Sequence, residues 1–235
     1  MKLISETETN LEHGVINYRN QVVVGVNSDD ELEIIKLASD EKVSIPVKLD
    51  TEFIEKMAIN QQNQLAILYD AYPNDIVEMI DINDPSQRKS LQTSLDRAEY
   101  MNLSEGGSLI LLWNDDKEVK LINTQTDTGL FLWTFDRSIK DTAISIDGKL
   151  LAIATENGEI YIRDTVTGNQ FAKFEIEVGK REIENIEFSN DGNKLAVNVR
   201  ELITVIDIKP LFKLTDDEYI KTNIEKLKTY YGFEN

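Results

Sequence analysis

The chain has 235 residues, of which 41% are hydrophobic and 29% charged, and its formal net charge is −18. This length and composition are typical of a folded globular protein and argue against intrinsic disorder. The acidity argues against nucleic acid as a partner, because polynucleotides carry dense negative charge. The absence of cysteine excludes disulfides, thiolate metal sites and a cysteine nucleophile, and it favours a cytoplasmic location.

Residues 1–14 hold one lysine and mainly polar side chains, without the apolar stretch of a secretory signal. No window of the sequence reaches the roughly 18 apolar residues that span a bilayer. We therefore expect neither a signal-directed secreted protein nor a membrane partner.

Residues 11–50 are predicted to hold the first and most degenerate copy of a repeat. Apolar residues fill Gln21–Val26, a polar turn follows, and a second apolar run covers Leu32–Leu37. Short apolar runs separated by turn residues are typical of antiparallel strands.

Four clearer copies follow in chain order, and two series of positions recur in them. The first series is a leucine that follows a polar turn, at Leu65, Leu109, Leu151 and Leu195. The second series is an Asp or Asn that ends an apolar run, at Asp81, Asn123, Asp164 and Asp207. Successive members lie 44, 42 and 44 residues apart in the first series and 42, 41 and 43 in the second. Two series that keep one period indicate a structural repeat.

Each copy is predicted to form four short strands. Asp147-Gly148 and Asp191-Gly192 are turn signals, because glycine adopts positive φ without steric cost. Four strands in some 42 residues are the size of one propeller blade, whose faces are buried only when blades stack. We predict an all-β β-propeller of about five four-stranded blades over residues 1–212, with blades at roughly 11–50, 51–95, 96–137, 138–178 and 179–212.

Residues 139–208 carry the most specific motifs: an Asp-Gly-x-x-Leu-Ala hairpin at Asp147–Ala152 and Asp191–Ala196, and a strand, Ile160–Asp164, that ends in Asp and is followed by Thr167-Gly168. These motifs resemble those of the WD-repeat β-propellers, in which the strand ends in Trp-Asp. The repeats resemble the divergent bacterial members, or generic propeller repeats, more than the regular signalling scaffolds. The resemblance weakens over 53–135 and again over 11–50. The position of the family's tryptophan is held by Ile80, Ile122, Arg163 and Ile206, and the only histidine, His13, does not form the family's Gly-His pair.

The family usually closes its ring with seven repeats, so five leave the mode of closure open. The N-terminal stretch supplies either a sixth partial blade or the outer strand of the last blade, with Leu3-Ile4 beside Thr204–Ile208. Alternatively, the chain is a subunit whose ring is completed by another chain or by oligomerisation.

Residues 213–235 differ from the repeats and are predicted to form a C-terminal α-helix. Thr215 is a suitable cap, and Asp217 and Glu218 favour the positive end of a helix dipole. Apolar residues from Tyr219 to Tyr231 follow helical spacing. The helix either packs on the propeller or docks a partner.

The sequence contains few residues of the types that act as nucleophiles or general bases in catalysis. A Ser-His-Asp triad would have to use His13, and the acidic pairs lack the spacing of a calcium loop. The Gly pairs match no phosphate-binding motif. We predict no catalytic, cofactor or metal site, and a hydrolase or lyase in the propeller channel is the least favoured alternative.

The resemblance to WD-repeat propellers implies a non-catalytic scaffold or sensor that binds protein partners. Loops between the second and third strands, and between blades, are expected to share one rim. Tyr, Trp and Arg dominate interface energies, so the candidate anchors in these loops are Tyr72, Trp113, Arg137, Arg181 and Arg200. For Trp113, the end of a buried strand is an equally good interpretation.

Overall fold

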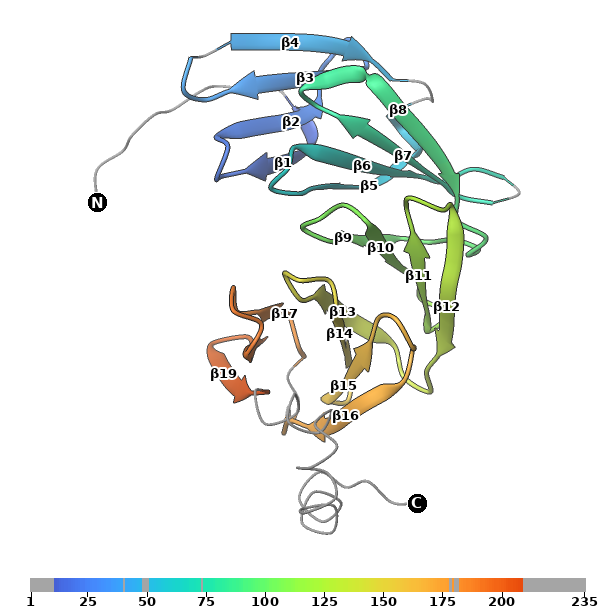
Figure 1. Ribbon diagram of the computed structural model, residues 1–235, viewed down its shortest axis with the longest axis vertical. Coiled ribbons are helices and arrows are strands. Elements are labelled where there is room, and N and C mark those ends of the chain that lie inside the picture. Colours follow the sequence, from blue (N-terminus) through green and yellow to red (C-terminus); the bar gives the residue numbers. More distant parts are fainter. Residues whose placement is uncertain are drawn as a thin grey trace. The chain divides into compact units, whose positions relative to one another are not determined.

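The structure is a computed structural model that describes residues 11–39, 41–47, 51–72, 74–177, 179 and 182–208. Within these residues the chain forms strands β1 to β19 and one 3-10 helix, η1 (Thr51–Phe53) (Figure 1). The strands make five antiparallel sheets, and strands that follow one another in the sequence are neighbours in each sheet. The prediction of a five-fold, all-β repeat is therefore confirmed.

The first two sheets are four-stranded. The first contains β1 (Glu12–Asn17), β2 (Val22–Val26), β3 (Glu31–Lys36) and β4 (Glu41–Pro46). The second contains β5 (Ile54–Ile59), β6 (Gln64–Tyr69), β7 (Ile76–Asp81) and β8 (Asp84–Gln92).

The third and fourth sheets repeat this order. The third contains β9 (Tyr100–Leu103), β10 (Leu109–Trp113), β11 (Glu118–Asn123) and β12 (Thr128–Thr134). The fourth contains β13 (Ile139–Ile144), β14 (Leu150–Thr155), β15 (Glu159–Asp164) and β16 (Gln170–Glu175).

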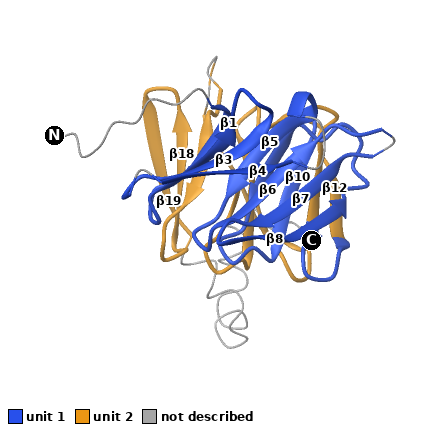
Figure 2. Ribbon diagram, turned by 90° about the horizontal axis from the view of Figure 1, so that it is seen from above, with its two compact units in different colours: residues 1–114, 122–129 blue, residues 115–121, 130–235 orange. Residues whose placement is uncertain are grey.

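The fifth sheet shows fewer than the four strands predicted for each blade within the described residues. Among the described residues it has three, β17 (Asn185–Phe188), β18 (Lys194–Val199) and β19 (Leu202–Asp207). The predicted pairing of Leu3-Ile4 and the predicted helix over 213–235 both lie outside the described residues. The chain divides into two compact units, residues 1–114 with 122–129 and residues 115–121 with 130–235, which Figure 2 colours separately.

Strand β6 in the first unit shows why the repeats stack. Leu65, Ile67 and Tyr69 pack in one apolar cluster with Val24 and other residues of the first sheet. The alternate residues Ala66 and Leu68 pack in a second cluster with Met101, Ile110 and Leu112 of the third sheet. Side chains of a strand point alternately to its two faces, so β6 is buried on both. Leu65 of the first series is thus a core position between sheets.

Hydrogen bonds between hairpin turns join successive repeats of the first unit. The Asn17 side chain donates to the Asn60 carbonyl at 2.8 Å, and the Asn60 side chain donates to the Ser104 carbonyl at 3.4 Å. Donor and acceptor are 43 and 44 residues apart, close to one repeat. All three residues are buried, so these bonds satisfy polar groups that water does not reach.

The predicted Asp-Gly turns of the second unit share one local structure. Asp147 Oδ1 accepts hydrogen bonds from Ser145 Oγ (2.8 Å) and the Lys149 N–H (3.1 Å). Asp191 Oδ1 does the same with Ser189 Oγ (2.6 Å) and the Asn193 N–H (3.1 Å). The following glycines have φ of +71° and +66°, which only glycine adopts at little cost.

The Asp147 turn predicts a pH-dependent contribution to stability. Desolvation alone would raise the pKa of Asp147, but the hydrogen bonds from Ser145 and Lys149 hold it below its usual value. A lowered native-state pKa stabilises the fold above the unfolded pKa of about 3.9, and this stabilisation is lost as the pH falls through the native-state pKa. Asp147→Ala is expected to cost about 1 kcal/mol at pH 7. Urea unfolding at pH 7 and pH 3 checks this, and a cost that stays equal at both values would contradict it.

Candidate functional site

Strand β8 of the first unit is interrupted by a bulge. Arg88 pairs with Ile80 and Asp84 with Asp81, so residues 85–87 lie outside the ladder of β7 and β8. Asp84 Oδ1 holds the bulge by accepting from the Ser86 N–H (3.2 Å) and hydroxyl (2.6 Å). Arg88 Nε donates to the Pro85 carbonyl at 2.9 Å. Bulges bend a strand and redirect its side chains, and they are frequent beside functional sites.

Beyond the bulge, strand alternation sends Arg88 and Lys89 to opposite faces of the second sheet. Arg88 Nη2 donates to the carbonyl of Pro46 in the first sheet at 2.8 Å, and Nη1 lies 3.5 Å from Glu78 Oε1. Lys89 Nζ donates to the Thr124 carbonyl, which follows β11, at 2.6 Å. Arg88 therefore binds groups of the first and second sheets, whereas Lys89 binds the third sheet.

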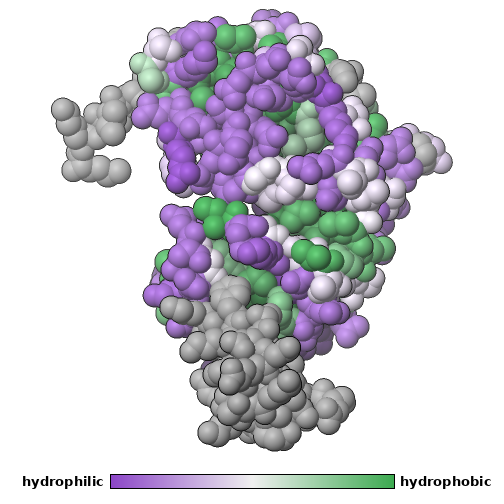
Figure 3. Space-filling model, in the orientation of Figure 1, coloured by the Kyte–Doolittle hydropathy of each residue, from purple (hydrophilic) through white to green (hydrophobic). Residues whose placement is uncertain are grey.

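A pocket of about 360 Å³ lies where these residues meet. Met79 and Ile80 of β7 supply apolar surface, and the walls include Gln64, Gln87, Lys89 and Gln125. This volume is within the usual size range of pockets for small ligands or single side chains. Hydrophilic residues dominate the face of the first unit in the view of Figure 3.

Gly107 gives the pocket part of its shape. A Cβ atom at this position would lie 1.6 Å from Gln64 Oε1, and its φ is +67°, so a side chain is excluded for two reasons. The Asn60 side chain holds Gln64 Oε1 by donating a hydrogen bond of 2.8 Å. Thr124 Oγ1 donates to the Gly107 carbonyl at 2.6 Å. The pocket is therefore preformed by contacts between the second and third sheets.

The charged groups of the pocket have different roles. Asp81 caps a turn, because its carboxylate accepts a hydrogen bond of 2.8 Å from the Asn83 N–H. Asn123 and Asp164 cap the equivalent turns of later repeats in the same way, each accepting from the N–H two residues further along at 2.9 Å. The ammonium of Lys89 has three N–H groups, and the contacts of the described residues assign one of them, to Thr124. Lys89 is thus the pocket's cation with capacity for a ligand.

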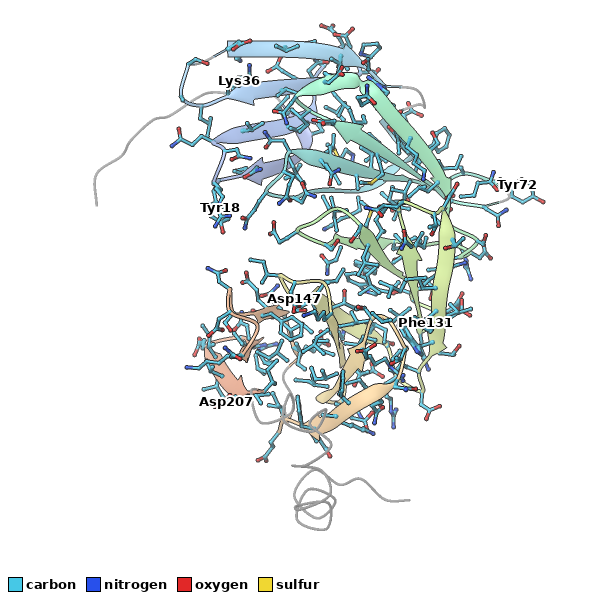
Figure 4. The ribbon with its side chains drawn as sticks, in the orientation of Figure 1. Tyr18, Lys36, Tyr72, Phe131, Asp147 and Asp207 are labelled. Carbon is cyan, nitrogen blue, oxygen red and sulfur yellow. The ribbon has the colours of Figure 1, made fainter. Side chains whose placement is uncertain are left out.

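The anchors predicted from sequence fall in other places. Tyr72 is fully exposed in the loop after β6 and points away from the sheet (Figure 4). Trp113 ends β10, is 5% exposed and stacks on Tyr100 with ring centroids 5.3 Å apart. Arg137 and Arg200 are exposed, and Arg181 lies outside the described residues. In the first unit, Tyr72 and Trp113 mark the C-terminal ends of β6 and β10, whereas the pocket lies where those strands begin.

The loop that carries Tyr72 is anchored by Asp75, which is 3% exposed. Its carboxylate accepts hydrogen bonds from the N–H groups of Ala98 and Ala71. Desolvation outweighs these bonds and raises the pKa of Asp75. The base of the loop is therefore fixed, while Tyr72 at its tip is open to solvent.

Arg163 holds the family's tryptophan position in the second unit, and the structure shows how. Its guanidinium lies over the rings of Trp133 and Phe135, 5.1 and 5.9 Å from their centroids, and Nη1 donates to the Gly168 carbonyl at 3.1 Å. Cation–π contacts of this kind are attractive. Trp133 and Phe135 thus pack against Arg163 at the position where the family's repeats carry tryptophan.

In the described part of the chain, no group of three or more His, Asp or Glu side chains has the arrangement of a metal site. Nor does that part of the chain contain a helix of the length and apolarity needed to cross a bilayer.

Comparison with solved structures places the fold. Kluyvelomyces marxianus Hsv2 matches with a TM-score of 0.68 and 16% identity over 88% of this chain. Kluyveromyces lactis Hsv2p matches with 0.64 and 15%, and KlHsv2 with its loop 6CD replaced by a Gly-Ser linker matches with 0.69 and 12%, each over 88%. The chain covers 66%, 64% and 68% of these three structures, respectively.

Comparison with family models identifies the repeat. Residues 101–191 match the WD40 domain of anaphase-promoting complex subunit 4. A search of curated proteins found no match. The prediction of WD-type repeats is confirmed over residues 101–191, and the likeness to the Hsv2 structures supports the β-propeller fold.

Proposed function

We propose that this protein is a non-catalytic interaction module that holds a peptide segment of a protein partner in the pocket beside the β8 bulge, hereafter the β8 pocket. WD40 propellers generally mediate protein–protein interaction. The observation that carries the assignment to this pocket is the bulge of β8, which is fixed by its own hydrogen bonds and sends Gln87 into the pocket wall. A cavity of about 360 Å³ accommodates one or two side chains of an extended peptide.

The chemistry of the walls supports a peptide. Gln64, Gln87 and Gln125 line the pocket, and amides both donate and accept hydrogen bonds. Gln64 Oε1 accepts from Asn60 and Gln87 Nε2 donates to Asp84, and each amide has further capacity beyond these bonds. These are the groups that pair with a peptide backbone. Met79 adds apolar surface for a side chain. The mixture of a few polar groups and an apolar floor is typical of binding sites.

Selection of unstructured peptides from a display library, using the full chain as bait, tests this function. Gln87→Trp places an indole at the pocket wall, and the exposure of Gln87 makes the change tolerable for folding. Gln92→Trp is the matched control, because Gln92 is an exposed glutamine at the other end of β8. We expect peptides that bind the wild type and the control but lose at least tenfold in affinity for Gln87→Trp. If every selected peptide binds all three proteins equally, the pocket is not the binding site.

A further inference from the structure

We infer that the β8 pocket selects partner segments by an acidic side chain, whose carboxylate binds the ammonium of Lys89. This inference rests on the proposed function. Nζ of Lys89 is held at the pocket wall by its 2.6 Å hydrogen bond to the Thr124 carbonyl. One N–H of the ammonium is used in this bond, and two are available for an anionic acceptor.

The other cation of the pocket strengthens the assignment to Lys89. Arg88 directs Nε to the Pro85 carbonyl, Nη2 to the Pro46 carbonyl and Nη1 toward Glu78. Three of its five N–H groups are therefore directed to the protein, and the Glu78 carboxylate, 1% exposed, offsets its charge. Lys89 is the pocket cation without such a buried counter-charge.

A single ammonium beside neutral amides favours a carboxylate over a phosphate. Phosphate carries close to two negative charges at neutral pH, and protein sites for it usually gather several cationic or backbone N–H donors. The carboxylate of Asp81 also lines the pocket, which adds repulsion that a dianion feels about twice as strongly as a monoanion. The net charge of −18 makes a segment with one acidic residue a better match than a polyacidic one.

The experiment measures the affinity of a pocket-dependent peptide from the selection above and of its Glu→Gln or Asp→Asn form. We expect the neutral form to bind the wild type about 10- to 100-fold more weakly, as for one charge-assisted hydrogen bond. Lys89→Met is expected to weaken the acidic peptide by a similar factor and to leave the neutral form unchanged. Lys89→Arg retains the charge and should restore most of the affinity. Lys56→Met, which removes an exposed lysine of β5, is the control and should change nothing.

Each other outcome has a defined meaning. Peptides that depend on the pocket, but bind equally with and without their acidic residue, would overturn the inference and leave the proposed function intact. A phosphoserine form that binds more tightly than the glutamate form, with the same dependence on Lys89, would reassign the site to phosphate. An equal loss for the acidic and neutral peptides in Lys89→Met would assign Lys89 to the structure of the pocket and not to the ligand.

Discussion

Replacing Arg88 with methionine is expected to lower the free energy of unfolding by about 3–5 kcal/mol. Glu78 is 1% exposed and would lose the guanidinium that lies 3.5 Å from its Oε1. The hydroxyl of Tyr69, 3.5 Å from Glu78 Oε2, does not replace that charge. Burial, together with the charge of Glu78, raises the pKa of Tyr69, so its hydroxyl remains protonated and neutral. Urea unfolding at neutral pH measures the effect.

The double variant Glu78→Leu/Arg88→Met separates the ion pair from packing. An apolar pair of similar volume often matches or exceeds the stability of a buried ion pair. We therefore expect the double variant to regain most of what Arg88→Met loses. A double variant that is destabilised by the sum of the two single changes would show that Glu78 and Arg88 are not coupled.

Leu65→Ala is expected to cost about 2–5 kcal/mol, because Leu65 is fully buried between the first and second sheets. The cost combines the lost transfer free energy of the side chain with the cavity left behind. Ile16→Ala is the control within the same unit, since Ile16 is 62% exposed, and it should change stability by less than about 0.5 kcal/mol. If the two variants lost similar amounts of stability, the assignment of Leu65 to the core would be wrong.

The repeat could be predicted from sequence because both of its series have a local physical cause. Leu65 and Leu195 repeat because each packs in a cluster between sheets, and Leu151 is also fully buried. In the third sheet the equivalent position is Ile110, one residue after Leu109, because Ile110 pairs with Leu103 as Leu65 pairs with Ile59. The Asp or Asn positions repeat because the side chain caps the following turn, as at Asp81 and Asp164. Such signals survive the loss of the family's Trp and His.

The pocket could not be predicted from the repeat, because it depends on a departure from it. The register of β7 against β8 changes by several residues between Ile80 and Asp81. The only local signal is Pro85, since proline inside a predicted strand is confined to edges and bulges. The partner of Lys89 is also 35 residues away, so the direction of its ammonium depends on how two sheets pack.

Interface composition directed the sequence prediction to a different end of the sheets. Tyr and Trp dominate binding energies, but Trp113 is buried in the first unit, where its ring stacks on Tyr100. Tyr72 is exposed as the loop assignment requires. Its role in binding stays a prediction, which the measurement below also addresses.

Backbone amide NMR of the full chain, titrated with a selected acidic peptide, tests the central claim most directly. If the peptide binds in the β8 pocket, the largest chemical-shift changes will occur at Gly107, Thr124, Gln125 and residues 87–89, and Gln87→Trp will abolish them. Chemical-shift changes centred on Tyr72, Arg137 or Arg200, with no change at the pocket residues, would contradict the account. They would place the binding site in the loops predicted from sequence.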